Sequence, residues 1–314
     1  MRSLQKFLAV CMLFLSLLLT GCGSSVNVAV DGAVHLHDLS PLPTPQSTDV
    51  VPIRVAVAAV ISPKGTVESY SPLFSYLSEA TGRPVEIVQR RTYAEVNDLV
   101  RTGEVDLAFV CTSSYLVGRR DFGMQLLVAP QVQGRTTYQA YLIVPADSPA
   151  QSLEDLRGGV FAFTDPISFS GRMVPTYWLQ QMGEVPETFF KRTFFTYSHD
   201  DAIHAVVRHL ADGASIDSLV FDFAVQRDPS LLEQVRIIRK SEPYGIPPVV
   251  VGPSVRPQIR SLLQEILLGM ADDPQGQAAL QALGYDRFVM VDEALYQSAM
   301  QVQDALHFEL QETP

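Results

Sequence analysis

Serine hydroxyls gather where a buried strand gives way to a helix, in the segment FTDPISFSGRM. The strand pattern ends at Thr164, and Asp165 and the following proline turn the chain. The helix then opens with Ser168, Phe169, Ser170 and Gly171. Hydroxyls and unpaired N–H groups at a helix N-terminus can bind an anion, because the free donors and the macrodipole both favour negative charge. Serines in this place also commonly cap their own helix, and the segment alone leaves both interpretations open.

A histidine occupies a similar position in the segment TYSHDDAIHAVV. His199 follows a predicted strand and opens a helix, at the strand end where open α/β sheets place ligands. It could donate one or two hydrogen bonds to an oxyanion. Asp200 and Asp201 are first-turn charges that complement the helix dipole, and His204 and His209 are expected on the surface.

A third donor-rich helix start lies nearer the N-terminus. Thr112, Ser113 and Ser114 stand between a predicted strand and a helix, although capping is the better interpretation for each of them alone. Tyr93 also precedes a helix beyond a strand end. These positions can converge with the others only if two parts of the fold face each other.

The elements that would position these residues begin after about residue 51. Apolar runs alternate with helical patterns and predict strands over 53–61, 85–89 and 106–110, a helix that starts at Ser71-Pro72, and a helix over 94–102. This βαβαβ order predicts a parallel sheet with helices on its faces.

The pattern starts again after Pro145. Strands are expected over 160–164, 193–196 and 218–221, with helices over 171–182 and 200–210. The chain then returns through strands at 236–240 and 249–251 and ends in helices near 257–271, 276–283 and 292–306. We therefore predict an α/β fold with a ligand cleft between lobe 1 (52–144 with 246–314) and lobe 2 (145–245), joined by two crossing strands. Pro145 and the Pro247-Pro248 pair are the expected edges of this hinge.

The N-terminus has the features of a bacterial lipoprotein signal peptide. Arg2 and Lys6 precede an apolar run that is short for a membrane span and ends in LTGC at Cys22. Residues 1–21 are expected to be removed, leaving Cys22 acylated and residues 22–51 as a flexible tether. The alternative is an uncleaved signal anchor with an incidental cysteine.

Composition excludes several classes of protein. The 314 residues are 47% hydrophobic and 18% charged, which is typical of a globular chain. The net charge of −11 becomes −13 without Arg2 and Lys6, which argues against nucleic acid as a partner. Cys111 has no partner for a disulfide once Cys22 is acylated. His35 and His37 lack further ligands, so no metal site is expected.

Several of these segments together resemble one known family. From about Ile53 to Tyr285, the chain resembles the phosphate/phosphite/phosphonate-binding proteins of ABC importers, which have the type II periplasmic-binding-protein fold. The matching motifs are LFSYLSEATGRPV, Tyr93 followed by LVRTGEVDLAFV, Tyr138 within YQAYLIVPADSP, SLEDLRGGVFAFTDPISFSG, and SHDDAIHAVV followed by IDSL. Their common order along the chain makes the resemblance specific.

The resemblance implies a ligand site between the lobes. Ser168 and Ser170 would contact the oxyanion within the loop that ends at Gly171, and His199 would hydrogen-bond to it. The two tyrosines, Tyr93 and Tyr138, would close over it from lobe 1. Phe169 stands where the family has threonine, which removes a donor worth about 1.5–3 kcal/mol and is expected to place an aromatic ring at the mouth of the site.

The resemblance also bears on the ligand. Family members that bind aminoethylphosphonate use carboxylates for its ammonium group, but Ala224 and Pro247 lie near those positions here. Glu242 or Asp222 could substitute, yet a zwitterion is not favoured. Phosphite, phosphate or an alkylphosphonate such as methylphosphonate fits better, with Phe169 leaving room for an apolar substituent.

The expected function is that of a lipid-anchored, extracytoplasmic binding protein. It would be a monomer without a cofactor that captures a small phosphorus oxyanion and delivers it to an ABC importer permease. A sensory module for a receptor kinase is an alternative that the sequence does not separate from transport. A phosphate-ester hydrolase is a weaker one, because no nucleophile or metal motif is present and His199 beside Ser198 lacks an orienting group.

Overall fold

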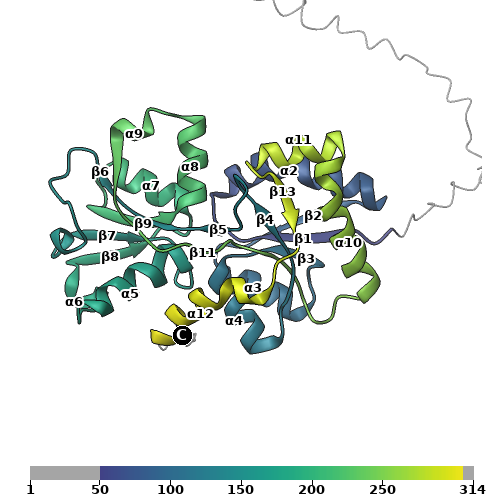
Figure 1. Ribbon diagram of the computed structural model, residues 1–314, viewed down its shortest axis with the longest axis horizontal. Coiled ribbons are helices and arrows are strands. Elements are labelled where there is room, and N and C mark those ends of the chain that lie inside the picture. The colour runs from purple at the N-terminus through teal and green to yellow at the C-terminus, as the bar shows by residue number, and fades with distance from the viewer. Residues whose placement is uncertain (1–49, 307–314) are drawn as a thin grey trace, which may run out of the picture. The chain divides into compact units, whose positions relative to one another are not determined.

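Two β-sheets organise the part of the chain that the computed structural model describes, residues 50–306 (Figure 1). The predicted signal peptide, Cys22 and nearly all of the predicted tether, with His35 and His37, lie outside the described residues. The first sheet contains, in spatial order, β13 (Arg287–Val289), β4 (Gln125–Gln131), β12 (Val249–Val251), β3 (Leu107–Phe109), β1 (Ile53–Val57) and β2 (Val85–Gln89). The β1 strand pairs in parallel with both β2 and β3, as the βαβαβ pattern predicts.

Helices cover both faces of this first sheet, and we call the sheet with its helices the first lobe. Strand β1 alternates its side chains, so that Val55 and Val57 face one apolar cluster and Ala56 faces another. The valine side packs against α2 (Pro63–Thr81), α10 (Pro257–Gly269) and α11 (Pro274–Ala282), and the alanine side against α3 (Tyr93–Thr102) and α4 (Thr112–Phe122).

The second sheet forms the second lobe. Its strands, in spatial order, are β10 (Val235–Lys240), β6 (Ala140–Pro145), β9 (Gly213–Asp217), β7 (Val160–Phe163) and β8 (Arg192–Phe195). One face packs against α7 (His199–Val207) and α8 (Ser218–Arg227), near the short α9 (Leu231–Gln234), and the other against α5 (Val174–Gln181) and α6 (Pro186–Phe189). The β6 strand, most of which the sequence analysis assigned to lobe 1, pairs with β9 and β10 in this second sheet. The exact lobe boundaries stay a prediction.

Two short strands lie between the sheets in Figure 1. The β5 strand (Thr137–Tyr138) pairs antiparallel with β11 (Tyr244–Gly245), with Tyr138 opposite Tyr244. The C-terminal helix α12 (Gln297–Ala305) contacts α4 of the first lobe and α5 of the second, where Gln180 Nε2 donates to the Ala305 carbonyl at 2.9 Å. The two lobes are therefore connected by paired strands and by a helix that contacts both.

Two predicted elements were wrong. The helix expected to start at Ser71-Pro72 starts at Pro63 instead, and Pro72 lies inside it. The interior proline is tolerated because this helix buries Leu73, Phe74 and Leu77 against the sheet. The predicted strand over 218–221 is the first turn of α8, and the strand is Gly213–Asp217, which ends where the Asp217 carboxylate caps the helix.

Candidate functional site

The serine-rich loop after β7 leads through a single wide turn, η2 (Phe169–Met173), into α5. Ser168 is the N-cap residue, and its Oγ accepts the Gly171 N–H at 3.1 Å, which is the capping role left open above. Gly171 lies so close to Thr164 that a Cβ atom there would be 1.8 Å from Thr164 Oγ1. Only glycine fits where this loop meets the end of β7.

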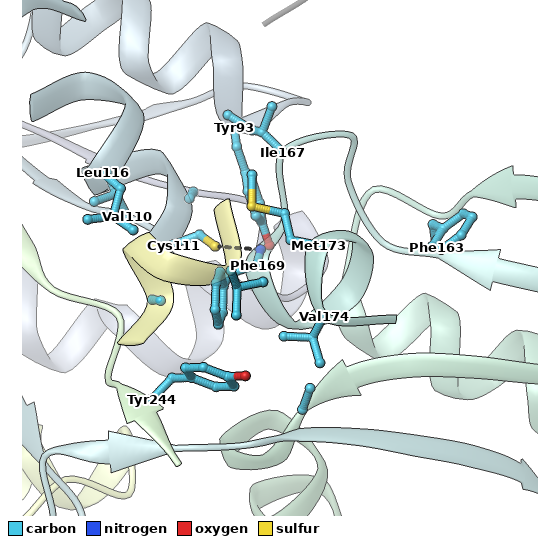
Figure 2. Close-up of a cluster of buried hydrophobic side chains, with 14 of the residues drawn as sticks. Tyr93, Val110, Cys111, Leu116, Phe163, Ile167, Phe169, Met173, Val174 and Tyr244 are labelled. Carbon is cyan, nitrogen blue, oxygen red and sulfur yellow. Dashed lines mark hydrogen bonds between the residues drawn. The ribbon is translucent and has the colours of Figure 1, made fainter. Parts of the chain in front are cut away.

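The loop contacts the first lobe directly. The Phe169 N–H donates to Cys111 Sγ at 3.3 Å, as Figure 2 shows, and the Tyr93 N–H donates to Asp165 Oδ2 at 3.1 Å. The Ser113 hydroxyl donates to the Ile167 carbonyl. These hydrogen bonds place helix starts from both lobes against each other, so the donors expected from each lobe meet at one interface.

Further hydrogen bonds join the lobes beside this interface. The His199 N–H donates to the Val60 carbonyl at 2.8 Å, and the Ser62 N–H donates to Asp200 Oδ1 at 2.9 Å. The Arg91 guanidinium lies 4.3 Å from the centre of the Tyr197 ring. The structure is therefore a closed one, in which the two lobes are in direct contact.

Several buried hydroxyls near this interface have no hydrogen-bond partner. Four of them, each less than 4% exposed, belong to Tyr93, Ser114, Tyr138 and Thr164. A buried polar group without a partner costs about 1–3 kcal/mol, and native proteins rarely leave several together. An oxyanion is a ligand that such donors can bind, since its oxygens accept hydrogen bonds only. The predicted Tyr93 and Tyr138 thus meet the serine loop, as Figure 2 shows for Tyr93.

His199 is buried as the first residue of α7, with Ser198 as N-cap. Its Nδ1 accepts the Asp217 N–H at 3.0 Å, so the neutral ring carries its proton on Nε2 and can donate one hydrogen bond instead of two. Burial lowers the pKa of His199 to about 3, with a smaller opposing effect from Asp200. The ring is therefore neutral at physiological pH and offers a dipole to an anion.

Two buried aspartates lie next to the site. Burial raises the pKa of Asp165 to about 6 and that of Asp217 to about 7, against the opposing effect of backbone hydrogen bonds. Asp217 Oδ1 accepts the Leu219 N–H at 2.7 Å and so caps α8. Neither carboxyl group pairs with a cation among the described residues. A bound anion next to an ionised Asp165 or Asp217 is therefore disfavoured unless strong hydrogen-bond donors surround the anion.

The Phe169 ring does not stand at the mouth of the site, contrary to the sequence expectation. The side chain is fully buried and meets the Tyr244 ring edge to face, 4.7 Å between ring centres (Figure 2). It belongs to an apolar cluster that continues through both lobes. The ring packs inward because the loop needs only the backbone N–H of Phe169 at the interface, and the benzyl group gains free energy by leaving water.

Two cavities lie near the contact between the lobes. The first, of about 100 Å³, is mostly apolar and is lined by Val60, Val110, Asp217 and Pro247 among others. The second, of about 480 Å³, is lined in part by Tyr138 and Asp222. Glu242, which the sequence analysis considered as a substitute carboxylate, lines neither cavity, and nor does Ala224. The smaller cavity therefore provides apolar space next to Val110 and Asp217.

Sequence reasoning missed three residues of this site. Cys111 lies at its centre, Thr164 fits against Gly171, and the Asp217 N–H fixes the His199 ring. In the run LAFVCTSSY, Cys111 lies between the buried strand β3 and the start of α4, and that position could have drawn attention to it. No other cysteine, and no group of His, Cys, Asp or Glu residues arranged for a metal ion, occurs within residues 50–306. In the same range, no helix is both long and apolar enough to span a membrane.

Comparison with known proteins decides the family. The profile of the family described as "ABC transporter, phosphonate, periplasmic substrate-binding protein" matches residues 55–296, most of the chain. The chain belongs to this family. As a phosphonate substrate-binding family member, it is 28% identical over 213 residues to the phosphate-import protein PhnD of Mycolicibacterium smegmatis, covering 63% of this chain and 66% of that protein. It is 23% identical over 241 residues to the phosphonates-binding periplasmic protein of Escherichia coli, covering 75% and 71% of the two chains.

Solved structures show the same fold. The family member superposes with a TM-score of 0.76 on a binding protein component of an ABC phosphonate transporter from Pseudomonas aeruginosa, at 22% identity, covering 80% of this chain and 85% of that one. The TM-score is 0.73 with PhnD1 from Prochlorococcus marinus in complex with methylphosphonate, at 17% identity, covering 81% and 98%. The predicted two-lobed, type II periplasmic-binding fold is confirmed, whereas the roles of single site residues stay predictions.

Proposed function

We propose that this family member is a lipid-anchored, extracytoplasmic solute-binding protein. It captures a small phosphorus oxyanion between its lobes and delivers it to an ABC importer, as a monomer without a cofactor or a catalytic role. Cys22 would carry the anchoring lipid. The observation that carries the proposal is the group of four buried hydroxyls without partners at an interface where the Phe169 N–H also points across the lobes.

The ligand class follows from the number and kind of donors. The Tyr93 and Tyr138 phenols, the Ser114 and Thr164 hydroxyls and a helix N–H suit a group with several acceptor oxygens. Phosphite, phosphate and alkylphosphonates are such groups, and the mostly apolar cavity next to Val110 and Asp217 suits an apolar substituent better than a fourth oxygen.

Calorimetric titration tests this proposal. Residues 50–314, which form one compact unit, are titrated with phosphate, phosphite, methylphosphonate, aminoethylphosphonate and sulfate. We expect micromolar or tighter binding of one phosphorus oxyanion and no binding of sulfate. A folded protein that binds none of the five would overturn the oxyanion proposal and leave only the fold.

Replacing His199 by asparagine should weaken oxyanion binding by about 10- to 150-fold, the equivalent of about 1.5–3 kcal/mol for a hydrogen bond to a charged group. Asparagine keeps an acceptor near the position of Nδ1 for the Asp217 N–H but lacks the Nε2 donor. Titration of the variant gives the change in affinity, and its melting temperature shows whether the fold is kept.

His204→Asn is the matched control for this experiment, because His204 lies on the same helix with an exposed side chain. Its affinity should equal that of the unchanged protein. An unaltered affinity in His199→Asn as well would remove His199 from the ligand site.

A further inference from the structure

Cys111 occupies the place where helix starts from the two lobes meet. It is the N-cap residue of α4, and its sulfur accepts the Phe169 N–H from the η2 turn at 3.3 Å. The Ser113 hydroxyl lies 3.6 Å from the same sulfur. The sulfur therefore lies between the N-terminus of α4 in one lobe and the η2 turn of the other.

Unpartnered hydroxyls point to the same place. The phenols of Tyr93 and Tyr138 are buried, and neither has a hydrogen-bond partner. Figure 2 shows the Tyr93 ring directed toward the contact between Cys111 and Phe169. The thiol thus lies among donors that an oxyanion would use, but a neutral sulfur is a weak acceptor and leaves them unsatisfied.

We propose that Cys111 is a peroxide-sensitive modification site whose sulfinate acts as a built-in oxyanion. Oxidised in this way, the side chain would present two charged oxygens to the Phe169 N–H and to the two phenols. It would take the position of the ligand and hold the lobes closed. The inference rests on the proposed function for its effect on transport, because a protein that is held closed cannot capture ligand.

The oxidation uses two molecules of hydrogen peroxide in successive steps. In the first step, the Cys111 thiolate attacks one peroxide oxygen, and the S–O bond forms as the O–O bond breaks. Both peroxide protons leave with the other oxygen as water, and a sulfenate remains. The sulfenate formed attacks a second peroxide in the same way and yields the sulfinate and another water. Sulfur is oxidised and peroxide is reduced, so no other reactant is needed.

Lobe opening controls access to the thiol. In the closed structure Cys111 is 4% exposed, and burial raises the pKa of its thiol despite the nearby N–H groups. Opening would admit water and peroxide while α4 still supplies its N-terminal donors. Ligand, which stabilises the closed form, should therefore protect Cys111 from oxidation.

The experiment treats the full-length protein in detergent with hydrogen peroxide, and peptide mass mapping separates Cys111 from Cys22 and from oxidised methionines. We expect two added oxygens on Cys111 and a higher melting temperature. Affinity for the ligand identified by calorimetry should fall by at least about 100-fold, since the sulfinate fills the donor site. The Cys111→Ala variant should show the same melting temperature and affinity before and after peroxide.

Several outcomes would overturn the inference. One is a Cys111 that stays reduced while methionines oxidise, and another is a sulfinate that leaves the melting temperature unchanged. A rise in melting temperature that also occurs in Cys111→Ala would assign the effect to another residue. The mass and melting readouts need no ligand. A protein that binds no oxyanion but melts at a higher temperature after oxidation would therefore contradict the proposed function and leave this inference standing.

Discussion

Replacing Gly171 by alanine should weaken oxyanion binding by at least about tenfold, the equivalent of one lost hydrogen bond to a charged group. The added Cβ atom would lie 1.8 Å from Thr164 Oγ1 and 2.8 Å from Thr164 Cβ, distances that no side-chain rotation relieves in full. The loop backbone must therefore move, and with it the N–H of Phe169 and the hydroxyl of Ser170. The same overlap should destabilise the protein by about 1–3 kcal/mol.

Calorimetry and thermal melting check this prediction together. Gly269→Ala is the matched control, because a Cβ at Gly269 meets no atom within 4 Å and its backbone is helical. This control should keep full affinity and melt at the same or a slightly higher temperature. Adding Thr164→Ala to Gly171→Ala should recover part of the lost stability. A Gly171→Ala protein with unchanged melting temperature and affinity would show that the loop is looser than the structure indicates.

Replacing Asp217 by asparagine should stabilise the protein at pH 8 much more than at pH 5. Burial raises the pKa of Asp217 to about 7, from near 3.9 in the unfolded chain. The folded state therefore holds a proton that the unfolded state has lost between those values, and stability falls as the pH rises through about 7. The loss amounts to at most about 4 kcal/mol above that pH, at about 1.4 kcal/mol for each unit of pKa.

Asparagine avoids this loss because it carries no charge and can still accept the Leu219 N–H as the cap of α8. The measurement is the difference in melting temperature between Asp217→Asn and the unchanged protein at each pH. Comparing the two proteins cancels His199, whose lowered pKa destabilises both at acidic pH. Asp273→Asn, at the partly exposed N-cap of α11, is the matched control for replacing a capping carboxylate outside the candidate site. An equal difference for Asp217→Asn at pH 5 and pH 8 would contradict a buried, titrating carboxyl group.

Local sequence patterns predicted most elements of the two lobes. The apolar runs at β1, β2, β7 and β10 are bounded by polar turns, and those local features are enough to identify a strand. The segment from Gly213 to Phe221 has apolar residues on both sides of Asp217, so periodicity could not show where β9 ends and α8 begins. The boundary depends on the Asp217 cap, which is only recognised once the fold brings strand and helix together.

The candidate site was harder to predict than the fold. The hydroxyl and histidine positions at helix starts were found because each follows a strand end, a local feature. Cys111 was not found, because a single cysteine after a buried strand cannot be distinguished by sequence from another small apolar residue. Its contact with the Phe169 N–H of the other lobe is a tertiary one. The inward packing of Phe169 against Tyr244 is likewise a tertiary contact that no neighbouring residue indicates.

The apolar cluster that continues through both lobes has a consequence for the heat signature of ligand capture. It joins Tyr93 and Cys111 of the first lobe to Phe169 and Met173 of the second, and none of these side chains is more than 4% exposed. Any opening of the lobes at this interface must hydrate part of that surface, and closing must release the water again. Closure around a ligand should then carry a negative heat capacity change. Cooling would weaken the hydrophobic part of the closing force, so the resting balance between open and closed protein would depend on the temperature of the habitat.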